Sequence, residues 1–207
     1  MRKIVLAFGF AAALASPALA REKLSPTPDD LSVQAIHNYA ACIVETTSRG
    51  AEEALSLDYA SEAYRKKLDR IAKGHADSRC MTGGQFRSSG VLLAGGMAER
   101  LVLEKLSAAT FATRVAYDAG KPPAQAHDAM EMTAMCVVRA APDKTWTIFT
   151  TAPTSREELG AMQAIGSTLA GCVPAGQKMA FNRPGVRAVL ALAAYHLTQP
   201  AAPAQGS

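Results

Sequence analysis

The sequence predicts an all-α protein with two pseudo-repeats of about four helices each, packed as one compact helical domain with one disulfide bond per repeat. Three observations support this fold class. Of the 207 residues, 42 are alanine, the strongest helix former. No six-residue segment alternates convincingly between apolar and polar residues, as a half-buried strand does. Finally, the four cysteines occur in an order of residues that recurs along the chain.

The overall composition is typical of a globular protein. Hydrophobic residues make up 49% of the chain and charged residues only 19%, which argues against a disordered chain. Four cysteines in 207 residues are too few for a disulfide-dense miniprotein. After residue 20, no apolar run approaches the roughly 18 residues that a membrane-spanning helix needs.

Residues 1–20 have the pattern of a cleaved secretory signal peptide. Arg2 and Lys3 precede an apolar stretch over residues 4–14, and Ala18-Leu19-Ala20 forms a small-residue cleavage site. No cysteine follows the apolar stretch, so a lipid anchor is not expected. We therefore expect a periplasmic or secreted protein that begins at Arg21. Removing Arg2 and Lys3 lowers the formal net charge from +4 to +2, which gives no reason to expect a nucleic-acid partner.

The first repeat is assigned to residues 21–121. Thr27-Pro28-Asp29-Asp30 predicts a helix start, with Thr27 as the cap, and this helix should end near Gly50. A short second helix is expected over residues 51–57. Ser61 should cap a third helix that ends before Cys80, and a fourth should start at Ser88 or Ser89.

The second repeat, residues 122–199, has matching signals. Its first helix should lie between Pro122-Pro123 and Pro142, and its second over residues 144–150. Residues 145–151 (TWTIFTT) are also the best strand candidate, but the equivalent segment AEEALSL favours helix. The spacing of Ser155 and Glu158 satisfies two backbone donors at the start of the third helix. Asn182-Arg183-Pro184 should start the fourth helix, and residues 200–207 form a Pro/Ala-rich tail that we expect to be disordered.

The two repeats align at an offset of about 94 residues. Tyr39-Ala-Ala-Cys42-Ile-Val44 resembles Thr133-Ala-Met-Cys136-Val-Val138, and Ser61 falls opposite Ser155. This register predicts one disulfide within each repeat, Cys42–Cys80 and Cys136–Cys172. Each would close a loop of about 38 residues and stabilise the folded protein by roughly 4 kcal/mol in the chain-entropy model. The alternative joins Cys42 to Cys136, between equivalent helices.

The combination of a signal peptide, alanine-rich helices and a repeated unit of two cysteines followed by Gly-Gln and Phe resembles small uncharacterised exported proteins of bacteria. The resemblance covers most of the mature chain. Its motifs are structural, so it implies a fold and a location but no activity.

Motifs for catalysis or for a cofactor are missing from the sequence. No nucleophile elbow, zinc-protease motif or phosphate loop occurs, and no two histidines have the short spacing usual in zinc sites. We therefore expect no catalytic, cofactor-binding or metal-binding residues. A rival hypothesis is a small hydrolase with a site between the repeats that uses Arg87, Arg183, His196 and Glu99. A further possibility places His37 and His127 together across a pseudo-twofold axis.

The most basic part of the chain lies in the third helix of the first repeat. Lys66, Arg70 and Lys73 share one helical face, which could meet an anionic envelope component or another periplasmic protein. The opposing interpretation is a solvated face, because Glu62 and Asp69 stand four residues before Lys66 and Lys73.

The leading functional hypothesis is an exported, non-enzymatic binding or interaction protein. The alternatives are the hydrolase above and a carrier of a lipid or amphipathic ligand. Apolar stripes in the fourth helices, around Leu93 and Leu190, together with Met130, Met132 and Met135, could line a groove for such a ligand or fill the core. An apolar cavity of several hundred Å³ would favour the carrier, and a close-packed interior would exclude it.

Overall fold

The computed structural model describes residues 29–74, 80–81, 90–120, 124, 126–180 and 182–199. The regular secondary structure of these residues is entirely helical, which confirms the predicted all-α class. The expected signal peptide, Ser88, Ser89, Arg87 and the C-terminal tail lie outside the described residues. The helices of the described residues are α1 (Asp30–Leu55), α2 (Glu62–Gly74), α3 (Gly90–Lys105), α4 (Ala108–Val115), α5 (Ala129–Ala140), α6 (Pro142–Thr150), α7 (Arg156–Ala164), α8 (Gly166–Cys172) and α9 (Arg183–Thr198).

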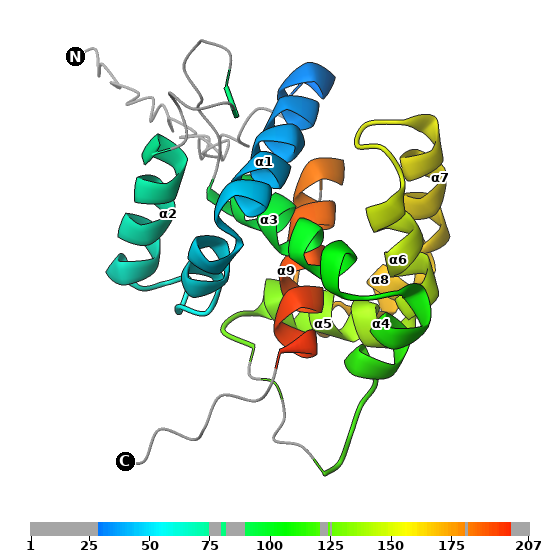
Figure 1. Ribbon diagram of the computed structural model, residues 1–207. Coiled ribbons are helices and arrows are strands. Elements are labelled where there is room, and N and C mark those ends of the chain that lie inside the picture. Colours follow the sequence, from blue (N-terminus) through cyan, green and yellow to red (C-terminus); the bar gives the residue numbers. More distant parts are fainter. Residues whose placement is uncertain are drawn as a thin grey trace, which may run out of the picture.

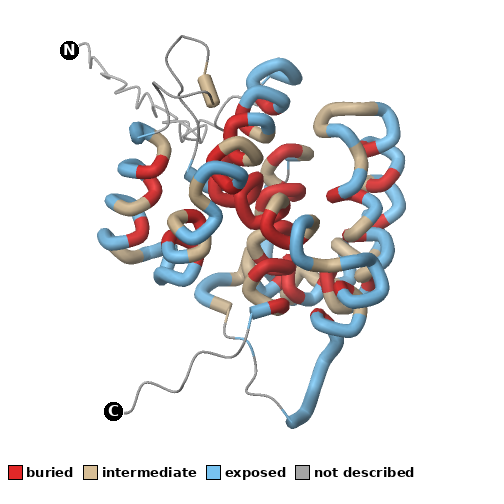
Figure 2. Tube along the Cα trace, viewed as in Figure 1, coloured by how far each residue is buried: buried red, intermediate tan, exposed pale blue. Residues whose placement is uncertain are grey.

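Helices α3 and α9 form the centre of the fold (Figure 1). They approach so closely that a Cβ atom built on Gly95 would lie 2.5 Å from the Cα and Cβ atoms of Ala188. Gly96 likewise faces α1, where its Cβ would lie 2.8 Å from that of Ala40. Small residues at these crossings let the backbones meet, and buried residues concentrate along the two central helices (Figure 2).

Larger side chains fill the space around this crossing. The core includes Ile43 of α1, Met97 and Leu101 of α3, Phe111 of α4 and Ile148 of α6, all fully buried. Their burial removes apolar surface from water, which is the dominant favourable contribution to folding. The interior of the fold is thus one continuous core that connects both predicted repeats.

Most predicted helix boundaries are close to the observed ones, with three differences in the first repeat. The N-cap of α1 is Asp29, whose carboxylate accepts a 2.8 Å hydrogen bond from the Ser32 backbone N–H, because an aspartate oxygen reaches the third backbone donor directly. The predicted break near Gly50 is observed three residues earlier: the backbone leaves helical geometry at Thr47, and α1 consists of two helical segments joined across this kink. The structure also adds the helix α4, capped by Ser107.

In the second repeat, the ambiguous segment around Thr145 is helical, as its alignment with the first repeat predicts. Ser155 caps α7 as expected and accepts a 3.0 Å hydrogen bond from the Glu158 backbone N–H. The third helix is divided at Ile165 into α7 and α8.

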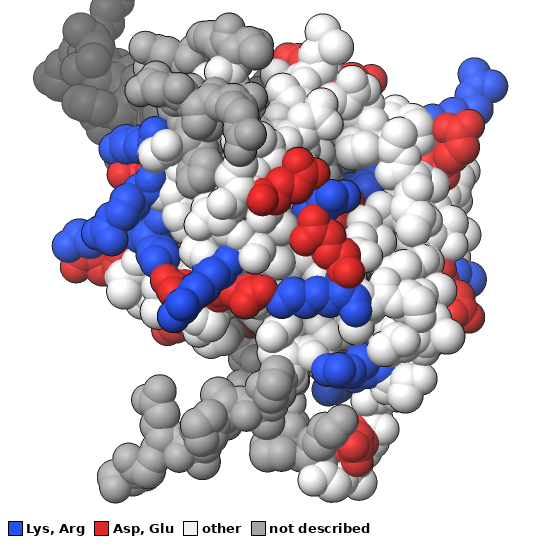
Figure 3. Space-filling model, viewed as in Figure 1, with Lys and Arg blue, Asp and Glu red and all other residues white. Residues whose placement is uncertain are grey.

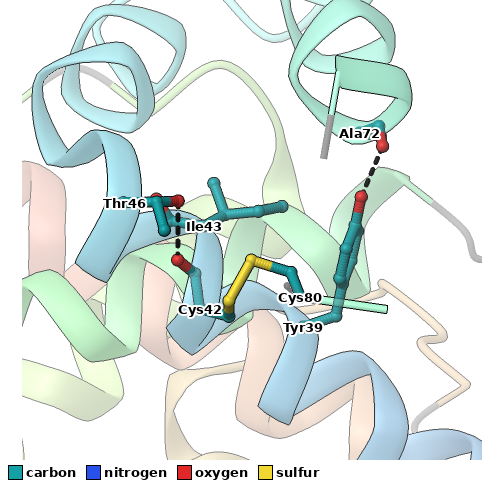
Figure 4. Close-up of a disulfide and its surroundings, with 6 residues drawn as sticks. All are labelled: Tyr39, Cys42, Ile43, Thr46, Ala72 and Cys80. Atoms are coloured by element: carbon teal, nitrogen blue, oxygen red, sulfur yellow. Dashed lines mark hydrogen bonds between the residues drawn. A yellow bond between two sulfur atoms is a disulfide. The ribbon is translucent and has the colours of Figure 1, made fainter. Parts of the chain in front are cut away.

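Both disulfides lie within the predicted repeats, which excludes the alternative bond between Cys42 and Cys136. Cys42 of α1 is bonded to Cys80, and Cys136 of α5 to Cys172 at the end of α8. Close to the first disulfide, the Tyr39 hydroxyl donates a hydrogen bond to the Ala72 carbonyl near the end of α2 (Figure 4). The Cys42–Cys80 disulfide therefore fastens the chain that follows α2 to the middle of α1. The hydrogen bond from Tyr39 to Ala72 is a second contact between α1 and this part of the chain.

Equivalent positions of the two predicted repeats are buried alike. Ile43 and Val137 are both 0% exposed to solvent, and Leu55 and Phe149 are both 2% exposed. This agreement is what a duplication would produce, and the duplication itself stays a prediction. Among the described residues, no helix combines the length and the apolar character needed to cross a bilayer.

Candidate functional site

A pocket of about 800 Å³ lies between α2 on one side and α3, α5 and α9 on the other. Its size falls within the range typical of small-molecule sites, roughly 300–1,000 Å³. Most of its wall is apolar, formed by Leu55, Tyr64, Leu68, Leu93, Met130 and Leu192. Leu57, Tyr59 and Val91, which also line it, are among the few large apolar or aromatic side chains that remain exposed.

The α2 wall follows from the sequence of that helix. Tyr64, Leu68 and Ile71 repeat at helical spacing and are buried toward the fold. The adjacent face presents Arg65, Leu68, Asp69 and Ala72 to the pocket. Helix α2 therefore has one apolar face that packs against the fold and, beside it, a partly apolar face that borders the pocket.

The polar residues of the pocket gather where α1 and α9 end and where α2 and α5 begin. His196, in the last turn of α9, lies between two acceptors: its Nδ1 is 2.9 Å from a carboxylate oxygen of Glu131 and its Nε2 is 3.3 Å from the Leu55 carbonyl. The Leu55 carbonyl is one of the last carbonyls of α1, which has no partner within its own helix. His196 therefore joins three helices at one end of the pocket.

Glu131 is the centre of this polar end. Its second oxygen accepts 2.8 Å hydrogen bonds from the backbone N–H of His127 and from the His127 ring. Burial acts to raise the pKa of Glu131, but the hydrogen bonds from His196 and His127 outweigh it and lower the pKa to about 2. The carboxylate is therefore ionised and engaged through both oxygens.

Asp128 and Tyr59 form the other part of the polar end. Asp128 is the N-cap of α5 and accepts a hydrogen bond from the Glu131 backbone N–H. Its other oxygen accepts a 2.7 Å hydrogen bond from the Tyr59 hydroxyl. This bond is the largest of the influences that raise the pKa of Tyr59 to about 12, followed by burial and the nearby carboxylates. The phenol therefore stays protonated and acts as a donor to Asp128.

A second group of charged residues lies inside the fold, away from the pocket. Arg187 of α9 is 1% exposed and donates two 2.8 Å hydrogen bonds to Glu99 of α3 and one of 2.7 Å to Glu158 of α7. Arg183 lies 2.7 Å from the second oxygen of Glu158. The two acids and two arginines balance in charge, and the network joins α3, α7 and α9.

The structure separates the residues of the hydrolase hypothesis. Glu99 and Arg183 belong to the buried network, whereas His196 lies at the pocket with Glu131. His37 and His127 have different surroundings: His37 faces Glu99 at 3.9 Å, and His127 contacts Glu131. Among the described residues, no group of three or more His, Cys, Asp or Glu side chains is arranged so that it could hold a metal ion.

The basic face of α2 is exposed, as predicted. Lys66 and Lys73 pair with Glu62 and Asp69 at 2.8 Å each. Basic and acidic side chains stand next to one another over α2 (Figure 3). The predicted pairs are therefore formed, and binding of an anionic partner by Lys66, Arg70 and Lys73 stays a prediction.

The methionine patch is divided by the fold. Met130 lines the pocket, Met132 is 52% exposed and Met135 is buried. Sequence reasoning missed Tyr59, Asp128 and Glu131. The Asp128–Glu131 spacing is a cap signal that was available, but nothing local indicates that Glu131 meets His196, which is 65 residues away.

Comparisons of this chain with protein-family models, with curated proteins and with solved structures found no match.

Proposed function

We propose that this chain is an exported, non-enzymatic binding protein whose pocket holds the apolar chain of an amphipathic molecule. The observation that carries the proposal is the 800 Å³ pocket, whose apolar walls end in one polar cluster. Burying an alkyl chain there removes apolar surface of both ligand and protein from water. The exposed Leu57 and Val91 at the pocket supply apolar surface that a bound chain would cover.

The location is part of the same proposal. A signal-peptide pattern over residues 1–20 and two disulfides are typical of a protein that functions in an oxidising compartment outside the cytoplasm. Amphipathic molecules that cross an aqueous compartment need a protein surface to cover their apolar part, and the pocket provides one.

The methionines provide an internal test. Met130 lines the pocket, whereas Met132, two residues further on the same helix, is exposed and does not. With methyl-labelled methionine, titration with dodecyl maltoside below its micelle concentration should shift the Met130 resonance in NMR spectra and leave that of Met132 in place. Equal shifts of both methyl groups, or no saturable shift of Met130, would contradict the proposal.

A matched pair of variants on α2 gives a second test. Ala72 lines the pocket and Ala63 is exposed on the same helix. A72F should fill part of the pocket and weaken dodecyl maltoside binding by about tenfold, or ~1.4 kcal/mol. A63F adds the same side chain outside the pocket and should bind as the unmodified protein does. Circular dichroism of both variants checks that each is folded, and equal affinities would locate the binding elsewhere.

A further inference from the structure

The charges at the polar end of the pocket indicate which kind of head group the amphiphile carries. Three of the charged or titratable side chains that line the pocket, Glu131, His196 and Asp69, already belong to an ion pair or a histidine–carboxylate pair. Glu131 is bound by His196 and His127, and Asp69 pairs with Lys73 at 2.8 Å. These groups therefore do not need a counter-charge from a ligand.

Arg65 and Asp128 differ from the others. Both line the pocket, and neither has an ion-pair partner in the described part of the chain. The guanidinium of Arg65 is exposed in the first turn of α2, with donors that meet no acceptor there. Asp128 accepts only from neutral donors, the Tyr59 hydroxyl and the Glu131 backbone N–H.

The two unpaired charges are of opposite sign, yet they do not neutralise each other. Arg65 belongs to the α2 wall and Asp128 caps α5 on the facing wall, and no ion pair joins them. A head group that reaches both walls would therefore meet a cation on one side and an anion on the other.

We propose that the pocket selects an amphiphile with a zwitterionic head group, whose anionic part pairs with Arg65 and whose cationic part pairs with Asp128. The inference rests on the proposed function and adds the class of ligand to it. A head group with a single charge would pair with either Arg65 or Asp128 and leave the other residue without a partner. A neutral head group would leave both charges unpaired.

Four probes with the same dodecyl chain separate these possibilities. They are dodecylphosphocholine, which is zwitterionic, dodecyl phosphate, dodecyltrimethylammonium and the non-ionic dodecyl maltoside, each used below its micelle concentration. Dissociation constants are measured from the Met130 methyl shift at low ionic strength, because salt screens these contacts. We expect dodecylphosphocholine to bind about tenfold more tightly than dodecyl maltoside, a difference of ~1.4 kcal/mol.

Two substitutions assign the two charges. Asp128→Asn removes the negative charge and keeps a good N-cap, so α5 should stay intact. It should weaken binding of the phosphocholine and trimethylammonium probes by about fivefold to tenfold and leave dodecyl phosphate no weaker, as expected for loss of a charge-assisted contact. Arg65→Gln should weaken binding of the phosphocholine and phosphate probes by a similar factor.

The chain offers a matched control for each substitution. Asp29→Asn changes the N-cap of α1, which does not line the pocket, and Arg70→Gln removes a charge of α2 that does not line it either. Both controls should bind all four probes as the unmodified protein does. Equal binding of the non-ionic and zwitterionic probes would overturn the head-group inference and leave the proposed function in place. Failure of all four probes would overturn the proposed function itself.

Discussion

Arg187 and Glu99 lie side by side in the core, 88 residues apart in sequence and joined by two hydrogen bonds of 2.8 Å. Arg187 also donates to the carbonyls of Phe149 and Thr151. One buried guanidinium thus holds α3, α7 and the end of α6 around α9. Each nitrogen of the Arg187 guanidinium has an acceptor, which is the condition under which a buried charge is tolerated.

Arg187→Met should destabilise the protein by ~3–5 kcal/mol, because it leaves Glu99 and Glu158 as buried carboxylates without their main partner. Burial already raises the pKa of Glu99, and Arg187 is the group that opposes this. The free energy of unfolding is measured by urea denaturation. Arg100→Met removes a cation from the solvent-accessible ion pairs with Glu45 and Glu104 and should cost about 1 kcal/mol or less. Similar losses for both variants would contradict a special role for Arg187.

His37 should make stability fall in mild acid. Burial, with a smaller contribution from Arg187, lowers the pKa of His37 from 6.5 to about 4. Between pH 6.5 and about 4, His37 is therefore protonated in the unfolded chain but not in the folded chain. Stability should be full above pH 6.5 and decline by ~3 kcal/mol as the pH falls toward 4.

His37→Gln should flatten the curve of unfolding free energy against pH between 6.5 and 4. The loss connected with Glu131 belongs to a lower window, since its pKa is about 2 in the fold and 4.5 in the unfolded chain. A variant curve parallel to that of the unmodified protein across the upper window would show that another group is responsible.

The two disulfides should differ in their effect on the pocket. Replacing either pair by alanine should reduce stability by roughly 4 kcal/mol in the chain-entropy model, because the closed loops span 38 and 36 residues. Only Cys42–Cys80 fastens the chain next to α2, a wall of the pocket. Binding of dodecyl maltoside should weaken in C42A/C80A and persist in C136A/C172A, measured below the unfolding transition. Equal weakening in both would indicate a global effect.

Gly95 should not tolerate a methyl group. Gly95→Ala would place its Cβ 2.5 Å from Ala188 and force α3 and α9 apart, which should cost ~1–3 kcal/mol or more. Gly160 in α7 is exposed with no atom within 4 Å of its Cβ position, so Gly160→Ala should stabilise by roughly 0.5–1 kcal/mol. Thermal denaturation compares the two, and a stable Gly95→Ala variant would contradict the close helix crossing.

The sequence alone determined the features that depend on neighbouring residues. Ser155 and Glu158 predicted a helix start, and Glu62 and Lys66 predicted an ion pair, because both interactions lie within one helical turn. The disulfide pairing also followed, since a recurring order of residues implies a recurring local unit. The break in α1 was predicted near Gly50, three residues beyond the observed kink at Thr47, whereas the helix α4, capped by Ser107, was not predicted.

Only the tertiary structure brought together the residues that form the two charged clusters. Glu131 meets His196, and Arg187 meets Glu99, because helix packing places distant segments at the same point. In sequence, each of these residues is an ordinary polar position on an amphipathic helix. The pocket, too, is a space between helices, and its size depends on how α2 is held against the others. Local sequence specifies each helix, whereas the close approach of small residues such as Gly95 and Ala188 decides how the helices meet.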